Sequence, residues 1–242
     1  MRLLRASCLL VSVTAMAAGG LSTSPAVNAA EASSYAVSTT TLPDGSTTTV
    51  RWDPCGDRIT FKVNVGALAR ADRSAAVREA KKKVRQLAKA SGLRFSYRGK
   101  TSFVPRSDNA ASQPAELVVG YVRAEQTDYP LAGPAAGYGG YNFGWQGRTD
   151  GSISYGVTSA YVVIDVADTR TWSTSLTRGG VTRPGLLGHE LGHAVGLMHV
   201  ADRHQVMYPS LHSGSPRTYA DGDRTGLDQV GRAAGCLRPV TS

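Results

Sequence analysis

The sequence lacks an apolar run long enough to cross a membrane. The nearest candidate is a stretch of about ten apolar residues at 9–18, preceded by Arg2 and Arg5 and followed by small residues up to Ala29. A spanning helix needs roughly 20 such residues. A basic start, a short apolar core and a small-residue end predict a secretory signal peptide over residues 1–30. A membrane anchor is the alternative, which the short core disfavours.

Cysteine is also scarce, since the whole chain has three. Cys8 falls in the predicted signal peptide, which leaves Cys55 and Cys236 near the two ends of the remaining chain. An exported protein meets an oxidising environment, in which pairing is the default. We therefore predict one disulfide between Cys55 and Cys236. In the alternative, Cys55 is a thiolate that blocks a metal site in a latent form, and Cys236 is unpaired.

Acidic residues are few relative to basic ones, with 18 Asp and Glu against 27 Lys and Arg and a net charge of +9. No acid precedes Glu31, so loss of Arg2 and Arg5 with the signal peptide leaves 9 − 2 = +7. The run Lys81–Lys83 lies in a helical pattern whose other face is apolar, which predicts a solvated helix face. An anionic cell wall is a further possible binding partner for this basic chain. We expect no nucleic-acid partner for an exported chain.

Large apolar residues are few between residues 31 and 50, which are rich in Ser and Thr. Such a segment cannot bury enough surface to order itself, so we predict a flexible lead-in or a short pro-segment. The chain has no internal repeats and no second compositional regime that would mark another folded domain. One catalytic domain is therefore predicted over residues 51–242.

Periodicity within this domain indicates both strands and helices. Apolar residues recur at spacings of three and four from about residue 72 to 90, and Gly92 follows as a helix stop. A Gly-rich and aromatic stretch from 131 to 156 allows tight turns and an exposed edge strand. Strands on both sides of a helix imply α/β or α+β layering. The predicted strands cover residues 59–65, 93–97, 117–122 and 161–166.

Three of the five histidines fall in one pattern, HELGHAVGLMH, which runs from His189 to His199. Pro184 suits the first turn of a helix, and apolar residues follow it at helical spacing. Residues four apart on a helix lie about 6 Å apart at Cβ, so His189 and His193 can direct two ring nitrogens at one metal ion. Glu190 is one position on. It cannot easily ligate the same ion, but it can hold a water there as a general base.

Gly196 stands three residues past His193, where a positive φ lets the chain turn sharply and brings His199 back as a third ligand. Three neutral nitrogens leave a fourth position open for water, as in catalytic zinc sites. A structural three-histidine site is the alternative, but such sites usually close the fourth position with Cys or His, and no extra cysteine is available. The other two histidines, His204 and His212, are predicted to lie on the surface.

These motifs resemble those of the metzincin clan of zinc metalloproteases. HELGHAVGLMH is similar to the clan's zinc signature, and the sequence VMYP with Met207 resembles its Met-turn. Pro209 stands where astacin-like and serralysin-like members carry a tyrosine that reaches the metal, which favours a matrixin-like member. The sequence YPLAGP at 129–134 resembles the matrixin YPFDGP loop. The chain thus looks like a secreted bacterial matrixin from about residue 52 to 236.

The resemblance implies a fold and a cofactor. The fold is an α/β (α+β) metzincin-like one: a twisted mixed five-stranded sheet with an antiparallel edge strand, a backing helix, an active-site helix and a C-terminal helix. No histidine precedes His189, so the second, structural zinc of matrixins is not expected. Ala132 replaces the loop aspartate associated with calcium, which leaves Ca²⁺ open and one catalytic Zn²⁺ as the expected cofactor. No PRCGVPD-like latency segment is present.

Together, these features predict a secreted, monomeric zinc endopeptidase in which Glu190 deprotonates the attacking water. The substrate would be a protein or peptide lying extended along an edge strand drawn from residues 137–143, and the loop after Met207 would shape a side-chain pocket. Two alternatives remain. One is a secreted zinc-containing binding module without turnover, and the other is a zinc hydrolase of non-protein amides.

Overall fold

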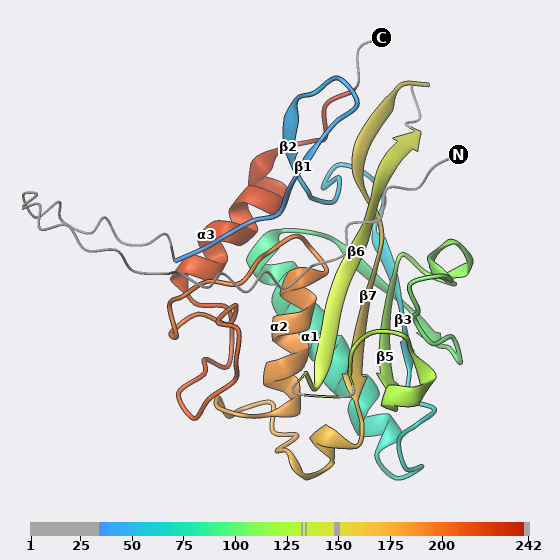
Figure 1. The fold of residues 1–242 in the computed structure, drawn as a ribbon, viewed down its shortest axis with the longest axis vertical. Coiled ribbons are helices and arrows are strands. Elements are labelled where there is room, and N and C mark those ends of the chain that lie inside the picture. The colour runs from blue at the N-terminus through green and yellow to red at the C-terminus, as the bar shows by residue number, and fades with distance from the viewer. Residues whose placement is uncertain (1–33, 132, 134, 148–150, 240–242) are drawn as a thin grey trace, which may run out of the picture.

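A twisted five-stranded sheet forms the centre of the fold, in a computed structural model that describes residues 34–131, 133, 135–147 and 151–239 (Figure 1). The strands lie in the order β4-β3-β5-β7-β6. All neighbours pair in parallel except β6, which pairs antiparallel to β7 at one edge. The strands are β3 (Ile59–Asn64), β4 (Phe95–Lys100), β5 (Leu117–Val122), β6 (Gly137–Gly147) and β7 (Ile153–Asp165).

The pattern of apolar residues explains which strands lie inside the sheet. Every residue of β5 is buried, as expected for a parallel strand covered on both faces. The edge strand β6 and its partner β7 are both longer than the sequence predicts. The extra residues of β7 are 153–160, which pair with β6. Polar residues and a glycine interrupt the apolar ones in this stretch, so it has no continuous apolar run that would predict a strand.

In the described part of the chain, three α-helices accompany the sheet, namely α1 (Arg73–Ser91), α2 (Arg183–His193) and α3 (Asp221–Val230). The main core lies between α1, α2 and one face of the sheet, where Leu87 and Leu187 are completely buried. Helix α1 ends at Gly92, whose φ of 70° lets its N–H donate to the carbonyl of Ala88. The predicted fold class is therefore confirmed. Short 3₁₀ helices occur at η1 (Ala110–Ser112), η2 (Ala124–Gln126), η3 (Asp168–Thr171) and η4 (Arg232–Ala234).

The segment before the domain is ordered. Residues 34–50 contain the antiparallel pair β1 (Thr39–Thr41) and β2 (Thr47–Thr49), and Val50 at their end is fully buried. The flexibility expected for residues 31–50 is therefore not found in residues 34–50, and the alternative of a short pro-segment stays a prediction. The segment is ordered because it gains backbone hydrogen bonds with the domain instead of burying large side chains of its own. The predicted signal peptide lies outside the described residues.

A buried ion pair ties α1 to α2. The guanidinium of Arg183, at the start of α2, donates to both carboxylate oxygens of Glu79 at 3.0 to 3.3 Å, and the hydroxyl of Tyr121 on β5 donates to the same carboxylate. Both charged side chains are less than a tenth exposed. This pair fixes the crossing of the two helices over the sheet.

The prediction that Lys81–Lys83 form a solvated face of α1 is wrong for Lys83. Its side chain is buried between α1 and α2, and its Nζ donates to the carbonyl of Arg217. Burial lowers the pKa of Lys83 to about 8. Lys81 and Lys82 are half-buried, and Arg85 is exposed, as predicted for a polar face.

The two ends of the described domain are joined covalently. Cys55 and Cys236 form a disulfide across 181 residues, with Cα atoms 5.3 Å apart. The guanidinium of Arg51 also donates to the carbonyls of Gly235 and Cys236. Among the described residues, no helix has both the length and the apolar content needed to cross a membrane.

Replacing Glu79 with alanine should destabilise the protein by about 3 to 5 kcal/mol, because Arg183 would keep its charge in a buried site without a partner. Urea denaturation measures this change. The matched control is Asp221→Ala, which removes an ion pair with Arg224 on the surface of α3 and should cost less than about 1 kcal/mol. Equal losses in the two variants would contradict the role given to the buried pair.

Candidate metal centre

Helix α2 places two histidines on one face. Its first turn is capped by Thr182, whose Oγ1 accepts from the N–H of Gly185, and Pro184 lies within that turn as predicted. The apolar residues of the helix are buried against the core. This burial fixes the rotation of the helix, so that His189 and His193 lie on one side of it and His193 lines a hollow beside β6.

The chain reverses directly after α2. Gly196 has a φ of 105°, as its predicted role requires, and a Cβ at this position would lie 2.4 Å from the carbonyl oxygen of Val50. Both the dihedral angle and the close approach of the backbone require glycine. The reversal brings His199 back over the face that carries His189 and His193.

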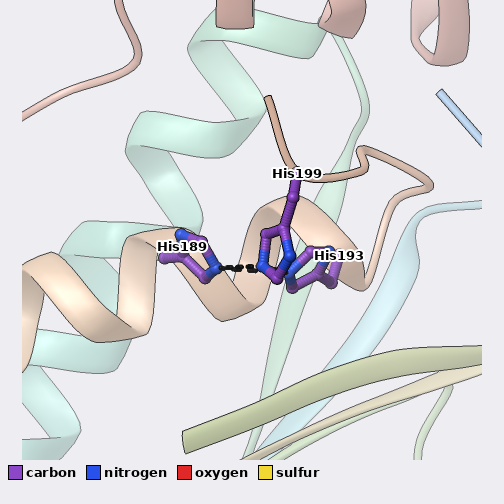
Figure 2. A group of neighbouring side chains, drawn as sticks. All are labelled: His189, His193 and His199. Atoms are coloured by element: carbon purple, nitrogen blue, oxygen red, sulfur yellow. Dashed lines mark hydrogen bonds between the residues drawn. The ribbon is translucent and has the colours of Figure 1, made fainter. Parts of the chain in front are cut away.

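The three imidazoles point toward one another, as Figure 2 shows. The Nε2 atom of His189 lies 3.2 Å from that of His193, and Nε2 of His199 lies 3.1 Å from each of the other two. His189 is buried, His193 is half-buried and His199 is exposed. The cluster is therefore closed to solvent on the side of His189 and open to solvent on the side of His199.

Backbone carbonyls fix which ring nitrogens carry protons. Nδ1 of His189 lies 2.7 Å from the carbonyl oxygen of Val206, and Nδ1 of His193 lies 2.9 Å from that of Leu197. A carbonyl only accepts, so each neutral ring must be protonated at Nδ1 and carry its lone pair at Nε2. The two Nε2 atoms thus direct lone pairs at each other without a proton between them. A shared cation removes this conflict.

Burial also keeps the histidines neutral. Removal from water lowers the pKa of His189 to about 4 and that of His193 well below its ordinary value, and the neighbouring imidazoles lower the pKa of His193 further. Neutral imidazole is the form that ligates a metal ion. Both rings are therefore ready to bind at neutral pH.

The spacing of the nitrogens fits Zn²⁺. Zinc–nitrogen bonds of about 2.0 to 2.1 Å in tetrahedral geometry place ligand atoms roughly 3.3 Å apart, close to the 3.1 to 3.2 Å between the Nε2 atoms. The described residues contain one other group of ligand-type side chains, formed by Asp53 with Cys55 and Cys236. Its cysteines are joined in the disulfide and are not thiolates. The three histidines are therefore the metal-binding group that the geometry supports.

Glu190 follows His189 on α2, and its side chain is buried. Its carboxylate accepts from the backbone N–H of Gly139 on β6, and a Cβ at Gly137 would lie 3.1 Å from its Oε1 atom. Burial raises the pKa of Glu190 to about 8 in the absence of a metal ion. A divalent cation nearby favours the ionised carboxylate and acts against this shift.

Met207 lies beneath the histidines, and sequence reasoning missed the group that holds it there. A Cβ at Gly192 would lie 2.4 Å from Sδ of Met207, so the thioether packs directly on α2 between His189 and His193. The carboxylate of Asp223 accepts from the N–H groups of Val206 and Met207 and is itself largely buried. Its position in the first turn of α3 is a sequence signal for helix capping, but nothing in the sequence connects it to the Met207 turn.

The N-terminal segment supports the loop that carries the third histidine. The N–H of Met198 donates to the carbonyl of Ala36, and the N–H of Ser38 donates to that of Gly196. The hydroxyl of Ser38 is also hydrogen-bonded to that of Tyr141 on β6 at 2.5 Å. Residues 36–38 therefore join the loop before His199 to the edge strand.

A small hollow of about 20 Å³ lies between β6 and the end of α2. Its walls include Gly139 and Tyr141 on the strand and His193 and Met198 on the other side. Strand β6 is at the edge of the sheet and pairs only with β7 among the described strands. The open edge of β6 therefore faces the histidine cluster.

The remaining histidines lie apart from the cluster. His204 is exposed and hydrogen-bonded to Asp202, and the half-buried His212 lies beside the carbonyl of Arg203. Ala132, which stands in place of the aspartate associated with Ca²⁺, lies outside the described residues.

Comparison with protein families identifies the class. The family model for matrixin peptidases, Peptidase_M10, matches residues 52–230. The chain therefore belongs to the matrixin family of metallopeptidases, and the resemblance inferred from the zinc signature and the Met-turn is confirmed. A search of curated proteins found no match.

Replacing Gly139 with alanine should destabilise the protein by about 1 to 3 kcal/mol, because the new Cβ would lie 2.1 Å from the carbonyl oxygen of Glu190 and force β6 away from α2. The control is Gly144→Ala on the same strand, where the new Cβ makes an ordinary contact at 3.6 Å and the change should stay within about 0.5 kcal/mol. Thermal and urea unfolding compare the two. A Gly139 variant as stable as the Gly144 variant would rule out the close approach.

Glu190 should make the metal-free protein less stable as pH rises from 4.5 to 8. In this range the folded state keeps a proton that the unfolded state releases, because the pKa is raised from 4.5 to about 8. Relative to Glu190→Gln, the wild-type protein should lose at most about 1.4 kcal/mol per pH unit. Urea denaturation of both metal-free proteins at pH 5, 6.5 and 8 measures the difference. Parallel pH profiles would contradict the buried, protonated carboxyl.

Proposed function

We propose that this chain is a secreted zinc-dependent endopeptidase that holds Zn²⁺ with His189, His193 and His199 and uses Glu190 as its general base. Membership of the matrixin family supports a zinc metallopeptidase acting on peptides. The observation that carries the assignment to these residues is the convergence of three Nε2 atoms beside a buried carboxylate.

A zinc ion held by His189, His193 and His199 would supply Lewis-acid chemistry, which polarises a carbonyl and lowers the pKa of water. The protein's own contribution begins with the carboxylate of Glu190, which is fixed by the N–H of Gly139 and accepts the proton of the attacking water. The same carboxylic acid then delivers that proton to the leaving amine nitrogen.

The substrate backbone is proposed to lie along the open edge of β6. Main-chain hydrogen bonds to this strand would fix the register of an extended peptide, as in other cases of strand addition. Gly137 and Gly139 bring the strand close to Glu190, so the bonds that the substrate makes with β6 also determine its distance from the base. The exposed residues that follow Met207 are proposed to form the wall of a side-chain pocket.

The catalytic unit is proposed to include residues 34–50 as well as residues 51–242. The backbone bonds from Ala36 and Ser38 to the loop before His199 support this boundary. Removal of residues 1–30 as a signal peptide would leave these bonds intact, whereas removal of residues 31–50 would break them. The disulfide between Cys55 and Cys236 is consistent with the proposed export to an oxidising environment.

Replacing Glu190 with alanine should lower the rate of casein cleavage by about 10² to 10⁴-fold, because the proton of the attacking water loses its acceptor. Zinc content, measured by atomic absorption, should stay near one ion per chain. The control is His204→Ala, an exposed histidine outside the cluster whose loss should leave both values unchanged. Full activity of the Glu190 variant would refute the assigned base.

Substrate panels separate the proposed activity from its alternatives. A zinc-loaded protein that cleaves neither casein nor gelatin, with or without 1,10-phenanthroline, would indicate a binding module. Hydrolysis of muramyl amides in place of proteins would indicate a zinc hydrolase of another substrate class.

A further inference from the structure

A second concave surface lies on the opposite edge of the sheet from β6. It is a groove of about 340 Å³ between helix α1 and strands β3 and β4. Strand β4 is the other edge of the five-stranded sheet. This volume is within the range of roughly 300 to 1,000 Å³ found for small-molecule sites and far exceeds the hollow beside the histidines.

The groove has positive charge on several sides. Its walls carry the cationic side chains of Arg58, Lys81, Arg85 and Arg94, and no acidic residue lines it among the described residues. Nζ of Lys81 lies 4.9 Å from the centroid of the Tyr97 ring, which fixes one ammonium group against the wall. Four cations around one concave surface repel one another, and a bound anion relieves that repulsion.

The floor of the groove is apolar. Phe61 and Leu93 are buried at its base, whereas Phe95 and Tyr97 are aromatic side chains left half-buried at its edge. The ring centroids of Phe61 and Tyr97 lie 5.2 Å apart, so the half-buried Tyr97 ring packs on the buried Phe61 ring. A hydrocarbon chain or a ring that covered this floor would remove further apolar surface from water.

The groove is separate from the metal centre. The residues of α1 that line it, Lys81, Val84, Arg85 and Ala88, recur at helical spacing on one face. Glu79 and Lys83, which contact the region of α2, lie on a different face of the same helix. A ligand in the groove would therefore not touch the histidine cluster, and its binding does not depend on the proposed proteolysis.

We propose that this groove binds a small amphiphilic anion, with an acidic head among Arg58, Lys81, Arg85 and Arg94 and an apolar chain or ring over Phe61, Leu93 and Phe95. Positive charge next to an apolar floor favours an amphiphilic anion over a neutral lipid, which would leave the cations without a counter-charge. The same features also favour it over an inorganic anion, which would leave the half-buried rings of Phe95 and Tyr97 exposed to water.

Calorimetric titration of the zinc-loaded protein with dodecanoate, below its micelle concentration, tests the proposal. We expect one saturable site, at least tenfold weaker binding in Arg85→Glu, and a similar loss in Ala88→Phe, which fills the groove. Lys89→Glu is the matched control. It makes the same charge change on an exposed residue of α1 that does not line the groove, and binding should stay within twofold of wild type.

Two further probes distinguish the contribution of the ligand's acidic head from that of its hydrocarbon chain. Dodecanol should bind at least tenfold more weakly than dodecanoate, and acetate should show no saturable binding. Equal binding of dodecanol and dodecanoate, or equal losses in the Arg85 and Lys89 variants, would overturn the proposal. Binding of a polyglutamate peptide that depends on Arg85, without binding of dodecanoate, would overturn it in favour of an acidic protein partner. Circular dichroism melting curves confirm that each variant is folded.

Discussion

The structure of the site depends on two hydrogen bonds from imidazoles to backbone carbonyls. Val206 and Leu197 each accept from an Nδ1 atom, and this leaves the lone pairs of His189 and His193 facing each other across 3.2 Å. Without a cation, such an arrangement is repulsive and buried. The fold tolerates it because both carbonyls belong to loops that other contacts hold in place. These contacts therefore orient both rings so that their Nε2 lone pairs can share one cation.

Those loops are held by close approaches to three glycines. Gly192 admits the sulfur of Met207 against α2, Gly139 admits the carbonyl of Glu190 against β6, and Gly196 admits the carbonyl of Val50 against the turn before the third histidine. Asp223 then secures the turn at Met207 from the far side. Each contact restricts the movement of the backbone that carries or supports a histidine ligand. Order in the site thus comes from elements far apart in the sequence, including the N-terminal segment.

The sequence could predict what depends on local pattern. The helical spacing of His189 and His193, the glycine turn to His199 and the apolar run at 161–166 all reflect short-range geometry, and the structure has each of them. Long-range contacts left no such signal. Residues 34–50 have few large apolar side chains, and backbone pairing orders them. Glu79 and Arg183 are 104 residues apart, so no periodicity could reveal their ion pair.

The central claim is that three neutral imidazoles share one zinc ion and leave a corner open. X-ray absorption at the zinc edge of the purified, zinc-loaded protein tests this claim most directly. The account predicts four nitrogen or oxygen ligands at about 2.0 to 2.1 Å, three of which show the outer-shell scattering of an imidazole ring. Substituting His199 should reduce the imidazole count by one. A sulfur ligand, or a fourth imidazole that closes the coordination sphere, would contradict the account.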